Sequence, residues 1–441
     1  MEEKKKKIHY AWVVLVACCG MTSSMGILFN SRGQWLLPVT TEMGMSTTEF
    51  ALLFTLGSIG LGIMAPVVGR ALPKVNVRIL LTGCAIVVLA TCFAMAFFNE
   101  SWMWPVSGLV IGIAGAFVFI VPTPIILGNW FVKKTGFVTG IALAAMGIAG
   151  AIANPIAAAL ISSMGWRSAC LVIAAIGAVV LLPCTIFLVR FKPEDMGLLP
   201  YGADAVSSES AETPAVALAN EGVSAKRALR SLSFWLMFIS ITVFSMLGGY
   251  AQLLPMYAES QGLPEIVGLV ATACMAGMFV GNLLLGALGD RFGGLPTTII
   301  GTIILVCGIL LLMFLGFAAI PVLVGGLLYG VVPSLTQVVP PLVCREVFGN
   351  KDFPKLYSTL NVAVSLVGAF GAVIVALILD TTGNDFIVAF SLGLGFAAFA
   401  VVAIVFSMVS GKKIAATPDR QVAGNKETSV ASCEMIARKE R

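Results

Sequence analysis

The first candidate for chemistry in this sequence is one charged side chain at the end of a long apolar run. Arg32 follows an apolar segment that begins near Tyr10, which places it about 33 Å along a helix at 1.5 Å per residue. A charge in the hydrocarbon of a bilayer is costly, so such a residue is a functional candidate. Its guanidinium can hold a carboxylate through two parallel hydrogen bonds. The alternative is an interfacial arginine whose side chain reaches out to water.

Uncharged polar side chains inside the other apolar runs are further candidates to contact a solute. Tyr329 and Gln337 are eight residues apart and share one broad helical face. Asn361 repeats at helical spacing with Ser358 and Ser365. The remaining substrate-binding candidates are Thr123, which lies between two prolines, Tyr250, Gln252 and Asn282. The alternative for each is a hydrogen bond between helices, worth about 0.6 kcal/mol on average.

A short charged loop with glycines occurs twice, 217 residues apart. The first copy, Gly69 to Asn76, reads GRALPKVN, and the second, Gly286 to Gly293, reads GALGDRFG. Pro124 and Pro341 repeat at the same offset, as do Phe131 with Phe348 and Lys134 with Lys351. The chain is therefore predicted to be one unit written twice. The charged residues in and near the two loops are Arg70, Lys74, Arg78, Asp290 and Arg291.

The composition indicates that these residues belong to a polytopic helical membrane protein. Of 441 residues, 59% are hydrophobic and 11% charged, and the mean hydropathy is +0.99. Soluble domains carry about 25% charged residues. The apolar runs are continuous, which excludes a membrane β-barrel, because its strands alternate apolar and polar residues.

Apolar runs of 18 or more residues predict an all-α fold of twelve transmembrane helices in two parallel halves of six, with a cavity between them. Their limits are 10–33, 48–69, 78–98, 103–127, 136–160, 167–190, 233–257, 264–288, 296–316, 320–343, 355–379 and 385–409. The predicted domains are an N-terminal bundle (1–190), a cytoplasmic linker (191–230), a C-terminal bundle (231–409) and a cytoplasmic tail (410–441).

The distribution of basic residues predicts the orientation. Cytoplasmic loops of membrane proteins carry an excess of Lys and Arg. With the N-terminus inside, the outer loops carry only Arg167, and both termini are predicted to be cytoplasmic. The inner loops then hold nine basic residues: Arg70, Lys74, Arg78, Lys133, Lys134, Arg291, Arg345, Lys351 and Lys355.

Other classes of function find little support in the sequence. The ten cysteines show no metal-ligand spacing, and no phosphate-binding motif is apparent. We therefore predict no enzyme, no catalytic residue, no metal and no cofactor. The net charge of +5 does not indicate nucleic acid, because the basic residues cluster in loops that flank the membrane. No Asp or Glu lies in the middle of a span, so the sequence offers no carboxylate there that could carry a proton.

The paired loops, the linker and the twelve spans resemble the major facilitator superfamily. Three segments are similar to the oxalate/formate antiporters and monocarboxylate carriers of that superfamily: Ser31 to Gly44, Asn129 to Gly136 and Phe191 to Pro200. The first loop copy departs from the family pattern, with Pro73 in place of the usual Asp and Asn76 in place of Gly.

The resemblance implies a secondary active transporter with alternating access and a small organic anion as substrate, moved by exchange or proton-linked symport. It also makes the charged residues of the paired loops candidates for gating: Arg70, Lys74, Arg78, Asp290 and Arg291. The similar carriers place charges in the eighth and eleventh spans, where this chain has Asn282 and Asn361. A monocarboxylate is therefore favoured over a doubly charged substrate. The alternative is an efflux carrier for a neutral or amphiphilic compound. We expect a monomer in the inner (plasma) membrane, with the lipid bilayer and the organic anion as its partners.

Overall fold

The computed structural model describes residues 9–132, 134–202, 222–382 and 385–415. Within these ranges the chain is helical and contains no strand; two isolated bridges join Phe131 to Tyr201 and Gly222 to Gly349. The predicted tail beyond residue 415, the middle of the linker and Lys133 lie outside the described residues.

The N-terminal group of helices contains residues 10–188. Its elements are α1 (Tyr10–Leu28), η1 (Asn30–Trp35), α2 (Leu36–Met43), α3 (Thr47–Ala71), α4 (Val77–Ala94), η2 (Met95–Phe97), α5 (Met103–Val118), α6 (Pro122–Trp130), α7 (Thr135–Pro183) and η3 (Cys184–Leu188). The short η4 (Pro193–Met196) follows at the start of the linker.

The C-terminal group begins after the linker. Its elements are α9 (Ala225–Leu229), α10 (Leu232–Ser260), η6 (Pro264–Ile266), α11 (Val267–Phe292), α12 (Gly294–Leu315), α13 (Ala319–Tyr329), α14 (Val332–Gln337), α15 (Val339–Phe348), α16 (Phe353–Val362), η7 (Ala363–Val367), α17 (Gly368–Thr382) and α18 (Phe386–Ala415). Helix α18 continues past the predicted limit of residue 409.

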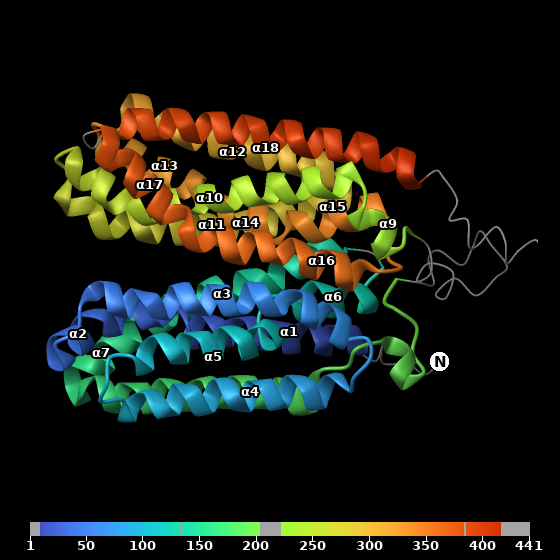
Figure 1. Ribbon diagram of the computed structural model, residues 1–441, viewed down its shortest axis with the longest axis horizontal. Coiled ribbons are helices and arrows are strands. Elements are labelled where there is room, and N and C mark those ends of the chain that lie inside the picture. The colour runs from blue at the N-terminus through green and yellow to red at the C-terminus, as the bar shows by residue number, and fades with distance from the viewer. Residues whose placement is uncertain (1–8, 133, 203–221, 383–384, 416–441) are drawn as a thin grey trace, which may run out of the picture.

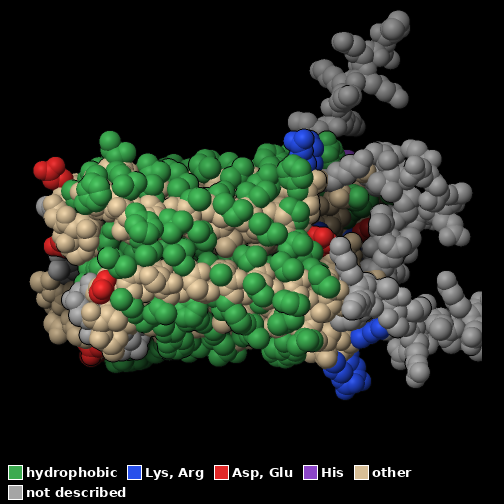
Figure 2. Space-filling model, turned by 90° about the horizontal axis from the view of Figure 1, so that it is seen from above, with side chains coloured by type: hydrophobic (Ala, Val, Ile, Leu, Met, Phe, Trp, Pro, Cys, Tyr) green, Lys and Arg blue, Asp and Glu red, His purple; other side chains and the backbone are tan. Residues whose placement is uncertain are grey.

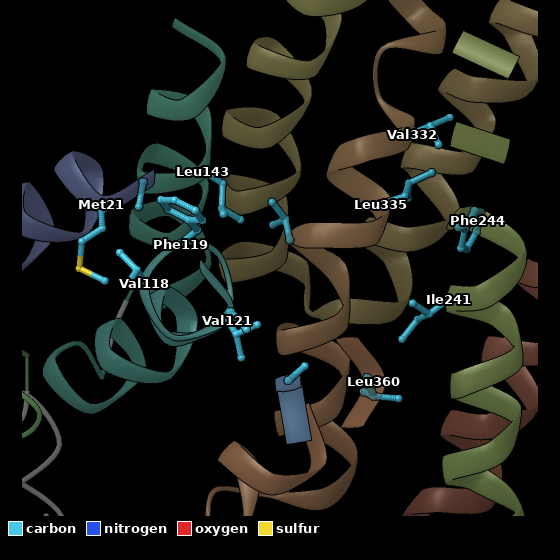
Figure 3. Packing of buried hydrophobic residues seen from close by; sticks show 14 of the residues in the cluster. Met21, Val118, Phe119, Val121, Leu143, Ile241, Phe244, Val332, Leu335 and Leu360 are labelled. Carbon is cyan, nitrogen blue, oxygen red and sulfur yellow. The ribbon is translucent and has the colours of Figure 1, made fainter. Parts of the chain in front are cut away.

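The two groups lie side by side as two layers of roughly parallel rods (Figure 1). Helix α1 begins at the end of the molecule where α9 lies and where α18 finishes. We call this end, which carries Tyr10, Gly202, Gly222 and Ala415, the linker end. Each group has its own buried apolar side chains, such as Phe119 and Leu143 in one and Phe244 and Leu335 in the other (Figure 3).

Ten helical segments of the described residues are long and apolar enough to cross a membrane, against the twelve predicted spans. The fifth and sixth predicted spans form one segment of 54 residues, Thr135–Leu188. This segment reverses at Gly165, which has a left-handed φ of 79°. Helix α1 contacts both of its arms, since Thr22 donates to the Ala142 carbonyl and Gly20 packs on Cys184. The predicted all-helical fold is confirmed; the fifth and sixth predicted spans are joined in this one segment, and part of the eleventh predicted span lies outside the described side chains.

The fourth and tenth predicted spans are interrupted at segments that contain prolines and glycines. The fourth is divided into α5 and α6 and the tenth into α13, α14 and α15, whereas the eleventh stays helical from α16 through the π-helical η7 into α17. Pro122 and Pro333 open α6 and α14, where a residue without an N–H is tolerated. The fourth and tenth spans are equivalent in the repeat, and interrupted helices at equivalent positions are typical of transporter binding sites.

Candidate functional site

A cavity of about 520 Å³ lies between the two groups of helices at the linker end. Its volume is in the range of small-molecule pockets, about 300–1,000 Å³. Glu194 and Asp352 are the acidic residues of its lining. The basic residues of the lining are Arg70, Lys74, Lys192, Arg345, Lys351 and Lys355. Six basic and two acidic groups leave a formal charge of +4, which favours an anionic solute.

Charges are also separated along the whole molecule. Figure 2 shows Lys and Arg side chains at the linker end, whereas most visible Asp and Glu side chains lie at the opposite end. At that opposite end, Arg167 forms an ion pair with Glu42, with 3.2 Å between Nη2 and Oε1. Its guanidinium also lies 4.3 Å from the ring of Trp166. Arg167 is thus fastened within the N-terminal group and lies away from the cavity.

Arg345 is the cavity residue with the most unusual surroundings. Its Nη2 donates to the Pro124 carbonyl, 2.8 Å away in the other group, and its guanidinium lies 4.1 Å from the ring centre of Phe353. Its Nε is buried and has no hydrogen-bond partner. Among the described residues, no carboxylate lies within ion-pair distance of Arg345. A partly buried guanidinium with an unpaired, buried Nε and no anion beside it is costly, which marks this position as a functional candidate.

From the sequence, Arg345 was predicted only to be a basic residue of an inner loop, and its buried, unpaired Nε was not predicted. The repeat offset of 217 residues contained a signal, because it pairs Arg345 with Gly128. These two equivalent positions face each other in the structure, and a Cβ on Gly128 would overlap the guanidinium of Arg345. Equivalent positions meet only near the axis that relates the two halves. Arg345 therefore lies near this pseudo-twofold axis, in the space that Gly128 leaves open.

Asp290 connects the two groups beside the cavity. Its Oδ1 accepts a hydrogen bond from the Gly136 N–H at 2.6 Å, and its Oδ2 accepts one from Phe137 N–H at 2.7 Å. Both donors belong to the first turn of α7, where unpaired N–H groups and the helix dipole favour a negative charge. The predicted gating residue of α11 is thus placed to hold the first turn of a helix in the other group.

The first loop copy has no such carboxylate. The repeat offset places Pro73 opposite Asp290 and Pro354 opposite Phe137. Proline at 73 supplies no acceptor side chain, and proline at 354, in the first turn of α16, supplies no N–H. Contact here is instead by close packing of Gly69 on Pro354 and Ser358. This side lacks both the acceptor and the donor. The contact of a carboxylate with a helix N-terminus, which we call the latch, is therefore present only between Asp290 and α7.

Glycine packing extends the contact between the groups toward the middle of the bundle. A Cβ on Gly140 of α7 would overlap the backbone carbonyl of Asn282 in α11. On the other side, Gly62 of α3 packs against Ser365 and Leu366. At Gly140 the two groups therefore approach to backbone distance, whereas at Gly62 a backbone meets side chains.

The other predicted gating residues differ in their surroundings. Arg70 and Lys74 are exposed and line the cavity. Arg78 lies outside the lining, and its Nε donates to the Val189 carbonyl at 3.2 Å within the N-terminal group. Arg291 is exposed, and its guanidinium lies 5.2 Å from the ring centre of Phe292 in the same helix.

Arg32 lies inside the N-terminal group and not in the cavity between the groups. It is 5% exposed, its Nη2 donates to the Cys92 thiol at 2.9 Å, and its Nη1 is buried without a partner. It lines a separate space of about 20 Å³ whose walls all belong to the N-terminal group. Such a space holds about one water molecule. The structure therefore does not bring Arg32 together with the cations of the cavity.

Three other predicted substrate-binding residues are buried and have their hydroxyls occupied. Tyr250 donates to the Ala389 carbonyl at 2.9 Å, and Tyr329 donates to the Leu247 carbonyl at 2.6 Å, both within the C-terminal group. Thr123 donates to the Phe119 carbonyl at the break between α5 and α6. The two tyrosine contacts match the alternative role as hydrogen bonds between helices, whereas the Thr123 contact joins residues only four apart in the chain.

The predicted amide residues fall into two classes. Asn361 donates to the Tyr357 carbonyl at 3.1 Å in its own helix. Asn282 is fully buried, and neither its Nδ2 nor its Oδ1 has a partner; the Oε1 of Gln337 is also buried and unpaired. Gln337 precedes the cavity residue Pro341 by one helical turn. The side chain of Gln252 lies outside the described side chains.

Both described ends of the linker pair with equivalent loops of the two groups. Phe131 forms its bridge with Tyr201, and Val223 N–H donates to the carbonyl of Phe348, the repeat equivalent of Phe131, at 2.9 Å. Asp352 accepts hydrogen bonds from Ala225 N–H at 2.8 Å and from Lys355 Nζ at 2.6 Å. The linker is thus fastened to both groups.

Acid is expected to release the contact of Asp352 with the linker. Burial raises the pKa of Asp352, but the hydrogen bonds from Lys355 and Ala225 outweigh this effect, so the pKa lies below its ordinary value of 3.8. A lowered pKa stabilises the fold above the unfolded value, and the contribution disappears as the pH falls below about 4. Melting temperatures of wild type and Asp352→Asn should differ at pH 7 and converge below pH ~4. A difference that does not change with pH would contradict this role.

Comparison with known proteins agrees with the helical fold described above. The profile of the Major Facilitator Superfamily matches residues 11–341 and 264–432. An uncharacterized transporter of Saccharomyces cerevisiae, ESBP6, is 23% identical over 80% of this chain, which spans only 52% of that relative. An uncharacterized 38 kDa protein of Thermoproteus tenax is 24% identical over 90% of both chains.

Solved transporter structures share the fold. The E. coli fucose:proton symporter FucP superposes with a TM-score of 0.62 at 13% identity, over 90% of this chain and 99% of that one. The proton:xylose symporter XylE superposes with a TM-score of 0.66 at 14% identity, over 90% and 95% of the two chains.

Proposed function

Because this chain belongs to the major facilitator superfamily, we propose that it is a secondary active transporter of a small organic anion, with a monocarboxylate as the favoured substrate. The domains would be the bundles 1–190 and 231–409, joined by the linker 191–230 and followed by the tail 410–441. The observation that carries the proposal is the cavity between the two groups, with its six basic and two acidic lining residues. Such a lining concentrates anions and disfavours cations.

Alternating access would proceed by rocking of the two bundles. The basic linker end would face the cytoplasm of a cell whose inner or plasma membrane holds the protein, in line with the excess of Lys and Arg on cytoplasmic loops. The Asp290 contact with α7 and the glycine packing above the cavity would close this end while the opposite end opens. A monomer is sufficient for this cycle.

Counterflow in proteoliposomes tests the proposal. Vesicles preloaded with mono- or dicarboxylates are assayed with and without a protonophore. Acceleration by an internal monocarboxylate is the expected result. Among the described side chains no Asp or Glu is fully buried, which favours exchange over proton-linked symport, so the protonophore should have little effect. A panel in which no carboxylate is transported by folded protein would overturn the proposal.

Substitution of Arg32 is expected to leave substrate affinity nearly unchanged, although its sequence position suggested a substrate-binding role. Its guanidinium faces a space of about 20 Å³ inside the N-terminal group, too small for a carboxylate. The KM of Arg32→Gln for the transported monocarboxylate should therefore stay within about threefold of wild type. A rise of about tenfold or more would instead establish Arg32 as a substrate-binding cation.

A neutral polar solute, including export of an amphiphilic one, is the second candidate. The buried, unpaired amides of Asn282 and Gln337 favour it, since an amide can both donate to and accept from hydroxyl groups. Inclusion of sugars and polyols in the counterflow panel separates the two candidates. Acceleration by a neutral solute, with none by any carboxylate, would select this alternative.

A further inference from the structure

We propose that Arg345 forms an anion subsite near the pseudo-twofold axis, where a carboxylate displaces the Pro124 carbonyl and thereby weakens the contact between the two bundles. This inference rests on the proposed transport of an organic anion. Arg345 would bind the anion at the linker end, and binding of the anion would favour the opening of that end.

The guanidinium of Arg345 has one hydrogen-bond donor without a partner and one that is paired with a neutral acceptor. One edge of its guanidinium carries Nε and Nη2. Nη2 donates to a neutral carbonyl at 2.8 Å, and Nε is buried without a partner. A carboxylate has two oxygens with the spacing to accept from both donors of one edge. It would therefore satisfy the unpaired donor and replace a neutral acceptor by a charged one.

The position of Arg345 explains why such binding would affect both bundles. The side chain comes from α15 in the C-terminal group, and its acceptor Pro124 belongs to α6 in the N-terminal group. An anion that takes Nη2 removes this hydrogen bond between the groups. Phe353, which lies in the same group as Arg345, keeps its ring 4.1 Å from the guanidinium and holds the side chain in place.

The repeat provides an unusually direct test. Positions 128 and 345 are equivalent, and the structure places Gly128 against the guanidinium. Exchange of the two residues, Gly128→Arg with Arg345→Gly, should bring a guanidinium to nearly the same place from the opposite bundle. The rescue should be partial, because the equivalent of Phe353 is Gly136, which offers no aromatic ring.

The measurement is the thermal stabilisation of the full chain in nanodiscs by acetate at constant ionic strength, with acetamide as the neutral control. Wild type should be stabilised by acetate alone. The Arg345→Gly variant should bind acetate about tenfold more weakly or worse, Arg345→Lys should be intermediate, and the exchange variant should recover much of the affinity. Lys192→Gln, which removes one charge from the same cavity, should change the affinity less than about threefold.

Accessibility of the linker end provides the second readout. Acetate should raise the labelling rate of a cysteine introduced at the cavity residue Thr139 in wild type, but not in Arg345→Gly. Equal acetate affinity in wild type and Arg345→Gly would overturn the subsite and leave anion transport standing. An equal loss in Lys192→Gln and Arg345→Gly, or an exchange variant no better than Arg345→Gly, would also overturn it. Absence of carboxylate counterflow in folded wild type would overturn the proposed function itself.

Discussion

Replacement of Asp290 by asparagine is expected to open the linker end of the transporter. The carboxylate accepts hydrogen bonds from the N–H groups of Gly136 and Phe137 in the first turn of α7. Asparagine has one acceptor oxygen and no charge, so it loses one hydrogen bond and the attraction to the helix N-terminus. Because Asp290 is exposed to water, we expect a loss of about 1–2 kcal/mol, which changes the equilibrium between the two states five- to thirty-fold.

The labelling rate of a cysteine introduced at Thr139, a buried residue of the cavity lining, measures this opening. It should rise in Asp290→Asn by up to the same factor as the equilibrium. Arg291→Gln is the matched control, since Arg291 is the next residue of α11 and its guanidinium lies near the ring of Phe292 in the same helix. Unchanged labelling in Asp290→Asn, or an equal increase in Arg291→Gln, would show that Asp290 does not hold the linker end closed.

The missing second latch makes this prediction stronger. Pro73 and Pro354 lack the acceptor and the N–H that would form the equivalent contact in the other loop copy. Between α3 and α16, closure therefore depends on van der Waals packing, which acts only at short range and involves no charged group. The departure of Pro73 from the family pattern was visible in the sequence. That Pro354 also lacks the N–H needed for an equivalent contact became clear only when the structure showed that Asp290 binds backbone N–H groups.

Most of the fold could be predicted from the sequence because the bilayer imposes simple rules. Backbone groups cannot remain unpaired in hydrocarbon, so each long apolar run must be a helix. The interruptions were harder to place. Pro122 and Pro124 were visible, but the break at Phe119 depends on local backbone geometry, with φ −90° and ψ −96°. By contrast, the turn at Gly165, where φ is a left-handed 79°, falls between the fifth and sixth predicted spans (136–160 and 167–190).

The candidate site was only partly predictable, because a side chain's direction and partners depend on packing between distant segments. Arg345 bonds to Pro124, which is 221 residues away. Arg32 was a candidate because of its depth in a span, yet its side chain points to Cys92 inside one group. Tyr250 and Tyr329 were candidates because of their polarity, but carbonyls of neighbouring helices occupy their hydroxyls. Polarity and depth can be read from a sequence, whereas the side of the helix that faces the cavity cannot.

Replacement of Gly140 by alanine is expected to have the largest effect on the closed linker end. A methyl group there would overlap the backbone carbonyl of Asn282 in the other bundle, and a backbone cannot move aside as a side chain can. Overpacking of this kind costs about 1–3 kcal/mol. In the proposed transport cycle the cost would fall on the state with the linker end closed, because opening would separate the two backbones. Labelling of a cysteine at Thr139 should therefore rise five- to 150-fold, with loss of transport.

The matched control for this substitution lies on the same helix. Gly147 of α7 is seven residues further along, and a Cβ there would have no atom within 4 Å. Gly140→Ala and Gly147→Ala both gain about 1 kcal/mol of helix propensity, so the difference between them isolates the contact with Asn282. Equal labelling and equal transport in the two variants would show that the bundles do not close at Gly140. A strong effect of Gly140→Ala alone would identify backbone packing, beside the Asp290 latch, as the second element that holds the linker end closed.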